Sequence, residues 1–564
     1  MYYLNVRRCY TYMASLQSKI VKGITYWYII ESKRIDGKVK TFVVEYIGNT
    51  QKLKARFNEQ YKNQNGDMVI KSYIHGSTHA LLKIVNKLGI EGILDECFEP
   101  RTRDGVKRSL SLILIAIARM CAPGSKDSFP DWVKQTTLPD ELSIIKHGNL
   151  NCNHFWDQMD GIPIEALQEA ENKIVERIFD MYDIKLDKLA IDFSNYFTYI
   201  STSNTRNTLT KRNKNNKQKR SDLRQFQYAV VTTKEFTIPL YSYVYSGKDN
   251  DKTAFKNYIE NLKGRIPNYE SPDLTFIFDG GGTSKDNLKE VPYYICRFSL
   301  SCCKELYDKE LDETITLGKH KEINCKRLRK KIWDEDRTGI LTFSDKLYKG
   351  QVAGLELNIS KTIEDIKNQN IQLSNPKKRI DTTKDKFIVR VAEKILNRDH
   401  MSDVFNIIYN VDKNDKVETI EYEIKEDVVS EIKEKYFGKK MIITNRHDWT
   451  TEEILQAYFD QDAIEGIFKD SKAEEFIGFT PQFHWTDQKM IVNMFCSTLG
   501  LQLLGVLNKE LTDKGIKVTN KKLMATTERI REAWIKEKNS NIVKKQMEEM
   551  DDLEEKIWEA IKTI

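Results

Sequence analysis

Two aspartates directly follow short apolar segments, which is where sheet-containing enzymes often carry functional groups. Asp192 ends the segment 186–191, and Asp279 ends the segment 274–278 and is followed by three glycines. Functional groups of α/β proteins gather where strands end, and glycines let the backbone turn closely around a ligand. Taken singly, each aspartate also fits a turn or a helix N-cap. They are two of three carboxylates that stand out in the chain.

The third carboxylate is predicted from helical spacing. Tyr458, Glu465 and Lys472 follow one another at intervals of seven residues, and Gln461 lies between the first two. At about 100° per residue, a seven-residue step leaves neighbours only about 20° apart, so the three side chains share one stripe of a helix. The simpler interpretation is a solvated polar face in which the heptad arises by chance.

A strongly basic tract separates the first aspartate from the next predicted strand. Residues 201–224 contain a single acidic side chain, Asp222. The basic side chains of the tract are Arg206, Lys211, Arg212, Lys214, Lys217, Lys219, Arg220 and Arg224. Because a tract of this composition cannot bury anything, we predict a mobile loop, which is either a solvated connection or an arm that contacts phosphates.

The elements that must position these residues can be predicted from hydrophobic periodicity. Segments 26–30 and 41–46 flank Asp36-Gly37 and predict a β-hairpin. The segment 77–181 has helical spacing. Three strands, a helix, a strand, a helix and a strand are then predicted, over 186–193, 225–233, 238–247, 251–263, 274–278, 284–290 and 293–298.

The residues at these sites resemble the DDE transposases of bacterial insertion sequences. The resemblance is to the group whose catalytic glutamate lies in Tyr-x2-Arg-x3-Glu-x6-Lys. Tyr458, Glu465 and Lys472 match this spacing, whereas Gln461 stands where the group has arginine. Asp192 lies in Ile-Asp-Phe-Ser-Asn-Tyr-Phe, which is similar to the first block of the family. Further similar blocks cover residues 219–227, 238–251, 278–284 with Asn287, and 442–445.

The resemblance implies an α/β RNase H-like catalytic core, a mixed sheet with flanking helices. It also implies an insertion before the glutamate helix. We expect that insertion to be rich in β structure, because segments 340–343, 355–359, 386–391 and 441–444 have strand-like composition. The expected parts are an N-terminal β-hairpin region (1–76), a helical domain possibly for binding DNA ends (77–181), the first part of the core (182–304), the insertion (305–444), the second part with the glutamate helix (445–510) and a charged helical tail (511–564).

The chemistry implied by the resemblance is two-metal phosphoryl transfer. Asp192, Asp279 and Glu465 would hold two Mg²⁺ ions, for which Mn²⁺ may substitute, and DNA would be cleaved and then joined to a target. Side chains implied in binding DNA are Tyr458, Gln461, Lys472, Lys469, Arg212, Lys219 and Arg220. Glutamine cannot form the charged fork of arginine, so Lys469 or Arg446 could carry that contact instead. The implied partners are terminal inverted repeats, target DNA and a second copy of the chain in a synaptic complex.

Composition excludes several classes of protein. The chain has 564 residues and a formal net charge of +7, with 40% hydrophobic side chains, which predicts several folded domains rather than disorder. The nine cysteines show no CxxC pair and no zinc spacing, so we expect reduced thiols. We predict no transmembrane helix and no signal peptide, and hence a cytoplasmic protein. The resemblance implies a bacterial protein associated with the nucleoid.

Two other functions remain open at this point. A nuclease of the same fold would cleave DNA without strand transfer. A catalytically silent DNA-binding protein derived from a transposon would have lost the chemistry. Asp192, Asp279 and Glu465 are all present, which favours an active enzyme, whereas Gln461 keeps the silent alternative open.

Overall fold

A computed structural model gives the structure of the protein, and it falls into two compact units. Unit 1 comprises residues 1–79, 133–143 and 525–559, and unit 2 comprises residues 80–132, 144–524 and 560–564. The structure describes residues 14–564 except 22–23, 36–37, 55, 57–67, 214–215, 217–219, 319–320, 376–380, 462–465, 467–478, 480–481 and 538–541.

Unit 1 contains an antiparallel sheet near the N-terminus. Strands β1 (Ala14–Val21), β2 (Ile24–Ile35) and β3 (Lys38–Asn49) pair in the order β1-β2-β3. The predicted strands 26–30 and 41–46 are confirmed within β2 and β3, which pair antiparallel. The predicted turn residues Asp36 and Gly37 lie outside the described residues.

A second sheet of unit 1 corrects the prediction of a helical tail. Strands β19 (Arg531–Glu537) and β20 (Val543–Met547) lie between helices α18 (Asn520–Arg529) and α19 (Asp552–Lys562). Strand β19 pairs with β20 and with β4 (Met68–Ile74), more than 450 residues earlier in the chain. A strand whose partner is so distant depends on tertiary pairing, which local periodicity does not reveal.

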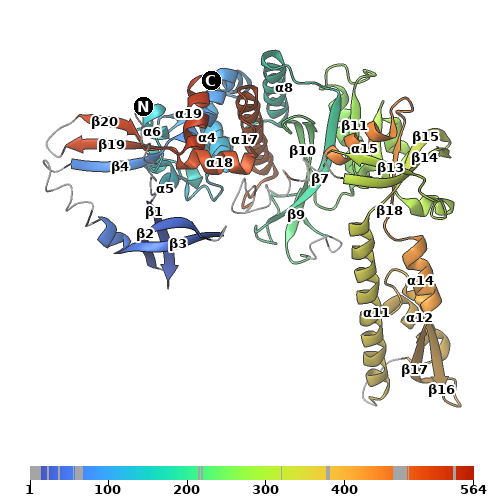
Figure 1. The fold of residues 1–564 in the computed structure, drawn as a ribbon. Coiled ribbons are helices and arrows are strands. Elements are labelled where there is room, and N and C mark those ends of the chain that lie inside the picture. Colours follow the sequence, from blue (N-terminus) through green and yellow to red (C-terminus); the bar gives the residue numbers. More distant parts are fainter. Residues whose placement is uncertain are drawn as a thin grey trace, which may run out of the picture. The chain divides into compact units, whose positions relative to one another are not determined.

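The main sheet of unit 2 mixes parallel and antiparallel strands (Figure 1). Strand β7 pairs antiparallel with β9 and parallel with β11, β11 pairs parallel with β12, and β12 pairs antiparallel with β18. In sheet order the strands are β10 (Pro239–Ser246), β9 (Arg224–Thr233), β7 (Lys188–Thr198), β11 (Thr275–Phe278), β12 (Tyr294–Phe298), β18 (Lys439–Thr444), β15 (Glu335–Phe343), β14 (Lys321–Ile332) and β13 (Glu313–Leu317), and β8 (Lys211–Arg212) pairs with β9. The predicted mixed sheet with flanking helices is confirmed.

Helices cover both faces of the central strands, because successive side chains point to opposite faces and most of them are apolar. On one face, Ile191 and Phe278 pack in a core with Phe255 of α9 (Asp251–Lys263). On the other face, Ile277 packs with Ile454 of α15 (Thr451–Asp460). Helix α15 begins with a capping box. The backbone N–H of Glu453 donates a hydrogen bond to the side chain of Thr450, and the backbone N–H of Thr450 donates one to the carboxylate of Glu453.

The region between residues 305 and 444 differs from the predicted β-rich insertion. Strands β13, β14, β15 and β18 extend the main sheet, and the remainder mixes helices with one hairpin. This remainder contains α11 (Asp345–Leu373), α12 (Lys384–Lys394), α13 (Met401–Val404), β16 (Phe405–Val411), β17 (Val417–Ile424) and α14 (Glu426–Lys435). The strand-like segments 355–359 and 386–391 are therefore helical, and that prediction was wrong. A short apolar run has no periodicity that separates a strand from a buried helix.

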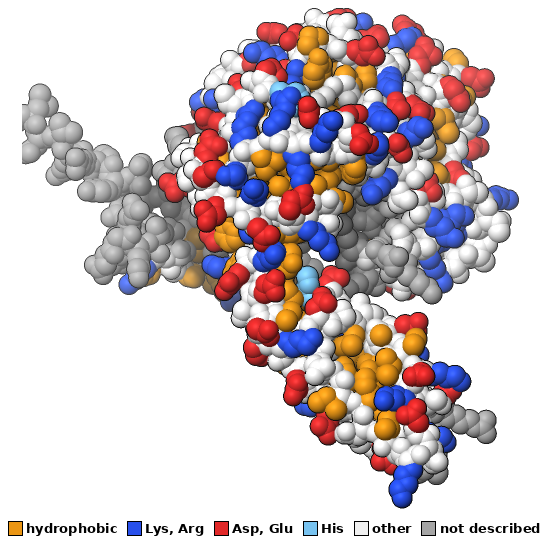
Figure 2. Space-filling view, turned by 90° about the vertical axis from the view of Figure 1, so that its right-hand side faces the viewer, with side chains coloured by type: hydrophobic (Ala, Val, Ile, Leu, Met, Phe, Trp, Pro, Cys, Tyr) orange, Lys and Arg blue, Asp and Glu red, His pale blue; other side chains and the backbone are white. Residues whose placement is uncertain are grey.

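The helix-rich insertion has its own hydrophobic core, formed by buried side chains such as Leu355, Phe387 and Ile420. Hydrophobic side chains are also gathered on its surface (Figure 2). The exposed ones are Leu357, Ile371, Val389, Ile408 and Val411.

The segment predicted to be helical, 77–181, contains helices and one small hairpin of β5 (Thr102–Arg103) and β6 (Val106–Lys107). Its helices are α2 (Gly76–Leu88), α3 (Ile90–Cys97), α4 (Arg108–Cys121), α5 (Phe129–Val133), α6 (Leu138–Glu141), α7 (Cys152–Met159) and α8 (Ile164–Met181). The segment does not form one unit, because residues 133–143 belong to unit 1.

Helix α17 (Asp487–Asp513) is long and apolar enough to cross a membrane by length and composition, but 94% of its most apolar window is buried inside the protein. It packs against α4, α7, α8 and β10. The contact with α4 is close at Gly500, where an added Cβ would lie 2.8 Å from the carbonyl oxygen of Ala116. This packing accounts for the apolar composition of the helix.

Replacing Gly500 with alanine should destabilise unit 2, because the new methyl group would push against the backbone of α4. We expect a loss of about 1–3 kcal/mol, as for other overpacked cores, measured as a lower midpoint of thermal or urea unfolding. Gly92→Ala is the matched control: this glycine lies in α3 with nothing within 4 Å of an added Cβ, so alanine should keep or raise the midpoint. Equal midpoints for the two variants would contradict the close packing of α17 on α4.

Candidate active site

The two predicted aspartates lie side by side in the main sheet. In the parallel pairing of β11 with β7, Phe278 is opposite Ile191, and the next residue on each strand is Asp279 and Asp192 respectively. Neighbouring strands lie about 4.8 Å apart. The structure therefore brings together two carboxylates that are 87 positions apart in the chain, at the same end of adjacent strands.

The two carboxylates also belong to one face of the sheet. Ala190 and Ile277 line a small cavity together with Ala457 and Gln461, and so face helix α15 and the residue that follows it. Because side chains alternate along a strand, the residues two positions further, Asp192 and Asp279, share that face. The face that carries the aspartates is thus the face on which α15 packs.

Asp279 is accessible and has a phenol and a guanidinium as neighbours. Its side chain is 51% exposed, and its Oδ1 lies 4.0 Å from Nη1 of Arg297 on β12. The hydroxyl of Tyr458 on α15 is directed at the same oxygen, 3.5 Å away. Oδ1 of Asp192 accepts a hydrogen bond of 2.7 Å from the backbone N–H of Phe193. A ligand can therefore approach Asp279 from solvent.

One of the three glycines after Asp279, Gly282, is required by packing. Residues Gly280–Gly282 form a short 3₁₀ turn. A Cβ added at Gly282 would lie 2.4 Å from the ring of Phe255, so only glycine lets α9 pack this closely below the turn. The sequence analysis assigned these glycines to a close turn around a ligand. At Gly282, however, the backbone packs closely against the hydrophobic core.

Tyr458 and Gln461 are both buried in the described structure, with exposed fractions of 6% and 8%. Burial, followed by the charge of Asp279, raises the pKa of the Tyr458 phenol, so the hydroxyl stays protonated and can donate. The side chain of Gln461 hydrogen-bonds to Tyr458. The predicted contacts of these two residues with DNA stay predictions.

Several predicted site residues lie outside the described residues, namely Glu465, Lys469, Lys472 and Lys219. Two described residues, Gln461 before that glutamate and Gln482 after it in the sequence, lie against β7. Gln461 lies beside Ala190, and Gln482 forms a parallel bridge with Thr198 at the end of the strand. The carbonyl oxygen of Gln482 also accepts from the N–H of Tyr199, at 3.2 Å. The role of Glu465 stays a prediction.

Two cations of the basic tract that are predicted to bind DNA, Arg212 and Arg220, are exposed in the structure. Arg212 lies on the edge strand β8 and has no ion pair closer than 4 Å among the described residues. Arg220 forms a fork with Asp222, with hydrogen bonds of 2.9 and 2.8 Å, and this holds the pKa of that carboxyl at about 2. Because an exposed ion pair contributes little free energy, Arg220 could exchange Asp222 for a phosphate.

Arg224, at the end of the tract, has a structural function that the sequence analysis missed. It is 9% exposed, and its guanidinium donates to backbone carbonyl oxygens of the preceding loop. The acceptors are Ser201 (3.3 Å), Asn204 (2.8 Å), Asn207 (2.6 Å) and Thr210 (3.0 and 3.1 Å). The prediction that residues 201–224 bury nothing was therefore wrong for residues 201–210. Its place directly before the predicted strand 225–233 was the only signal in the sequence.

Arg446 cannot replace the missing arginine of the motif. It is buried, and its guanidinium donates to Thr275 Oγ1 and to the carbonyl oxygen of Leu274, at 2.9 and 3.0 Å. Its guanidinium also lies 3.8 Å from the ring centre of Tyr293. Thr275 is the first residue of β11, whereas Asp279 follows the last, so Arg446 lies at the opposite end of the strand.

Comparisons with known proteins add little to this geometry. No family model matches the chain, and no curated protein matches it. Among solved structures, the chain is similar to a piggyBac transposase in a synaptic complex with hairpin DNA, with 8% identity and a TM-score of 0.38, over 80% of this chain and 79% of that one. A likeness this loose carries no argument about function, which must come from the residues themselves.

Replacing Arg224 with methionine should release the loop 201–210, because four carbonyl groups would lose a charged donor at once. We expect a loss of about 3 kcal/mol or more in unfolding free energy, since buried hydrogen bonds to charged groups contribute about 1.5–3 kcal/mol each. Hydrogen exchange of the amides of residues 204–210 should become faster. The exposed Arg212→Met is the control and should leave exchange unchanged; similar exchange in both variants would show that Arg224 does not hold the loop.

Proposed function

We propose that this protein is a DDE transposase of an insertion sequence. It would bind the terminal inverted repeats of its element and catalyse metal-dependent DNA cleavage and strand transfer. The observation that carries this proposal is the adjacent placement of Asp192 and Asp279 on parallel strands, facing the helix that leads to Glu465. The matching sequence blocks supply the reaction class.

The strand order supports an RNase H-like core. The part of the sheet that runs β10-β9-β7-β11-β12 has three antiparallel strands followed by two strands parallel to β7. Helix α9 connects β10 to β11, and α10 (Lys285–Lys289) connects β11 to β12. This order and connectivity agree with the RNase H-like core that the resemblance implies, with the two proposed carboxylates on its first and fourth strands.

The donor set fits a hard divalent cation. Asp192 and Asp279 offer carboxylate oxygens on one face of the sheet, and Asp279 is half exposed, so a partly hydrated Mg²⁺ or Mn²⁺ ion could reach it. We propose that Glu465 supplies the third carboxylate. When bound, two such ions would activate the attacking oxygen and neutralise charge that develops on the phosphate and the leaving oxygen.

The protein's own residues would orient the carboxylates and attract DNA. The protonated hydroxyl of Tyr458 donates towards Asp279 and limits its rotation. Arg297 lies beside the same carboxylate and offers a positive charge near a bound phosphate. Arg212, Arg220 and Lys219 from the loop, with Lys469 and Lys472, would contact the phosphate backbone and position the DNA without reading its sequence.

The proposed partners are terminal repeat DNA, target DNA and a second copy of the chain, since two element ends must be held together. The proposed location is the bacterial cytoplasm, at the nucleoid. A silent DNA-binding protein is the second candidate, and the observation that favours it is Gln461. This neutral residue is buried against Tyr458 where the family has a charged arginine. Cleavage without joining would instead identify a nuclease of the same fold.

Cleavage of the DNA that flanks the gene should require both aspartates. We expect the full-length protein with Mg²⁺ to produce discrete 3′-OH ends at inverted repeats and to join them to a second duplex. Asp192→Asn and Asp279→Asn should each lower the cleavage rate by about a thousandfold or more, because losing a carboxylate ligand removes several kcal/mol of transition-state stabilisation.

The matched control is Asp273→Asn. This exposed aspartate precedes β11, at the opposite end of the strand from Asp279, and its variant should cleave at the wild-type rate. Binding of the same DNA, measured by gel shift, should survive in all three variants. DNA binding by the wild type with no metal-dependent ends would overturn the proposal in favour of the silent protein.

A further inference from the structure

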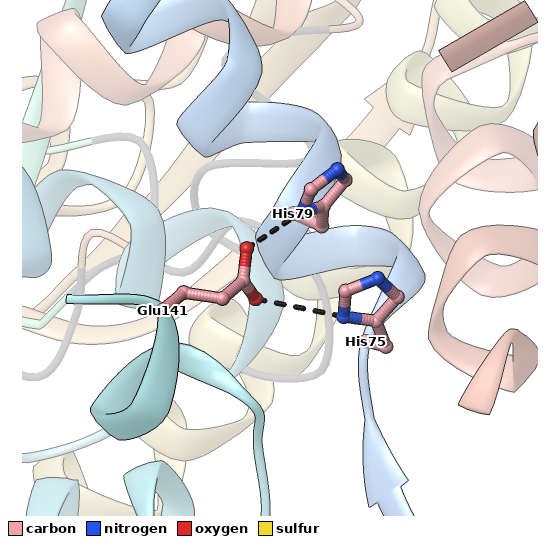
Figure 3. Close-up of side chains that lie close together, drawn as sticks. All are labelled: His75, His79 and Glu141. Atoms are coloured by element: carbon pink, nitrogen blue, oxygen red, sulfur yellow. Dashed lines mark hydrogen bonds and ion pairs between the residues drawn. The ribbon is translucent and has the colours of Figure 1, made fainter. Parts of the chain in front are cut away.

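Two histidines and a glutamate lie together in unit 1 (Figure 3), whereas the proposed active site belongs to unit 2. His75 immediately precedes α2, His79 lies in its first turn, and Glu141 is the last residue of α6. One nitrogen of each imidazole and a carboxylate oxygen all lie within 4.8 Å of one another, and no other group of this kind occurs in the part of the chain that the structure describes.

Backbone hydrogen bonds hold the three residues in place. The N–H of His79 donates to the carbonyl oxygen of His75 at 2.9 Å, so the two imidazoles are one helical turn apart and share a face. The N–H of Thr137 donates to the carbonyl oxygen of Ile74, which ties the start of α6 to the end of β4. The N–H of Glu141 in turn donates to the carbonyl oxygen of Thr137.

The side chains converge on one point. Nδ1 of His79 lies 2.6 Å from Oε2 of Glu141, and Nδ1 of His75 lies 3.5 Å from Oε1. The hydroxyl of Thr137 lies 2.8 Å from Nδ1 of His75 and 2.5 Å from Oε1 of Glu141. The indole of Trp558 packs against both imidazoles, with ring centres 5.0 and 5.4 Å away.

The charge and access of the group suit a cation. The carboxylate of Glu141 offers oxygens to a cation, and besides the two imidazoles it accepts a hydrogen bond from the hydroxyl of Thr137. The side chains of His79 and Glu141 are 23% and 18% exposed, which leaves a path from solvent. The side chain of His75 is 10% exposed and forms the inner side of the group.

We propose that His75, His79 and Glu141 bind a zinc-class divalent ion, with two imidazole nitrogens and one carboxylate as protein ligands. Ligand bonds of about 2.0–2.2 Å in a tetrahedral site place donor atoms about 3.4 Å apart. The separation of 3.5 Å between His75 and Glu141 already matches this value. The His79–Glu141 pair, at 2.6 Å, would exchange its hydrogen bond for the ion through a small side-chain rotation.

The chemistry of this group differs from that of the aspartate pair. Imidazole nitrogens favour zinc and related transition metals, whereas the all-oxygen set of Asp192 and Asp279 favours Mg²⁺ or Mn²⁺. The ion would connect two segments of unit 1 that are 62 positions apart in the chain, and so stabilise that unit. The inference does not depend on the proposed transposase activity.

The direct test is metal binding by the full-length chain without a histidine tag. After removal of metals by a chelator, Co²⁺ titration should give the visible absorption bands of a tetrahedral site, saturating at one ion per chain. Zn²⁺ should displace Co²⁺ and abolish the bands, whereas Mg²⁺ in large excess should not. The Asp192→Asn and Asp279→Asn variants should bind Co²⁺ as the wild type does.

His79→Gln and Glu141→Gln should each weaken Zn²⁺ binding at least about a hundredfold, since loss of a direct ligand costs more than the 10–100-fold of an outer-shell change. Asp140→Asn is the matched control, because this exposed carboxylate is the neighbour of Glu141 and pairs with Lys545 instead. Circular dichroism checks that each variant is folded.

Zn²⁺ should also raise the thermal unfolding midpoint of the wild type and of Asp140→Asn, but not that of His79→Gln. Two results would overturn the proposal. One is a folded wild-type chain that binds neither Co²⁺ nor Zn²⁺ saturably. The other is binding that both ligand variants retain at wild-type affinity.

Discussion

The parallel pairing of β7 with β11 is the constraint on which the proposed site depends. Because Ile191 lies opposite Phe278, Asp192 and Asp279 are next to each other, and both carboxylates lie on the face that α15 covers. A slip of one residue would move Asp279 to the other face, among the side chains that pack on α9. The hydrophobic cores on the two faces prevent this slip, because Ile277 and Phe278 fill different cores.

The strands that extend the main sheet lead to α15, the helix that covers the face of the two aspartates. Strand β18 returns from the insertion and pairs antiparallel with both β12 and β15, so the chain leaves the sheet at the end opposite to Asp279. The next helix is α15, which brings Tyr458 to Asp279. The insertion is therefore joined to the core by sheet hydrogen bonds, and its own helices and hairpin can vary without moving the carboxylates.

Local pattern predicted the strands that are buried on both faces, and it failed where contacts between residues distant in sequence decide the local structure. The apolar segments that end at Asp192 and Asp279 are strands because both their faces are buried, which composition reveals. Strand β19 pairs with β4, at the other end of the chain, so the local sequence does not predict it. The short apolar runs in α11 and α12 have no periodicity that distinguishes a helix from a strand. Arg224 organises its loop through backbone carbonyls, which leave no trace in side-chain type. The spacing of His75 and His79 carries no zinc motif by itself, because Glu141 joins them only in the folded unit.

The most direct test of the central claim is to locate Mn²⁺ by anomalous diffraction in crystals of the protein bound to its terminal repeat DNA. The account predicts an anomalous peak within ligand distance, about 2.2 Å, of carboxylate oxygens of both Asp192 and Asp279. The peak should vanish in crystals of Asp192→Asn. Saturating Mn²⁺ with DNA in place and no peak at these two residues would contradict the account.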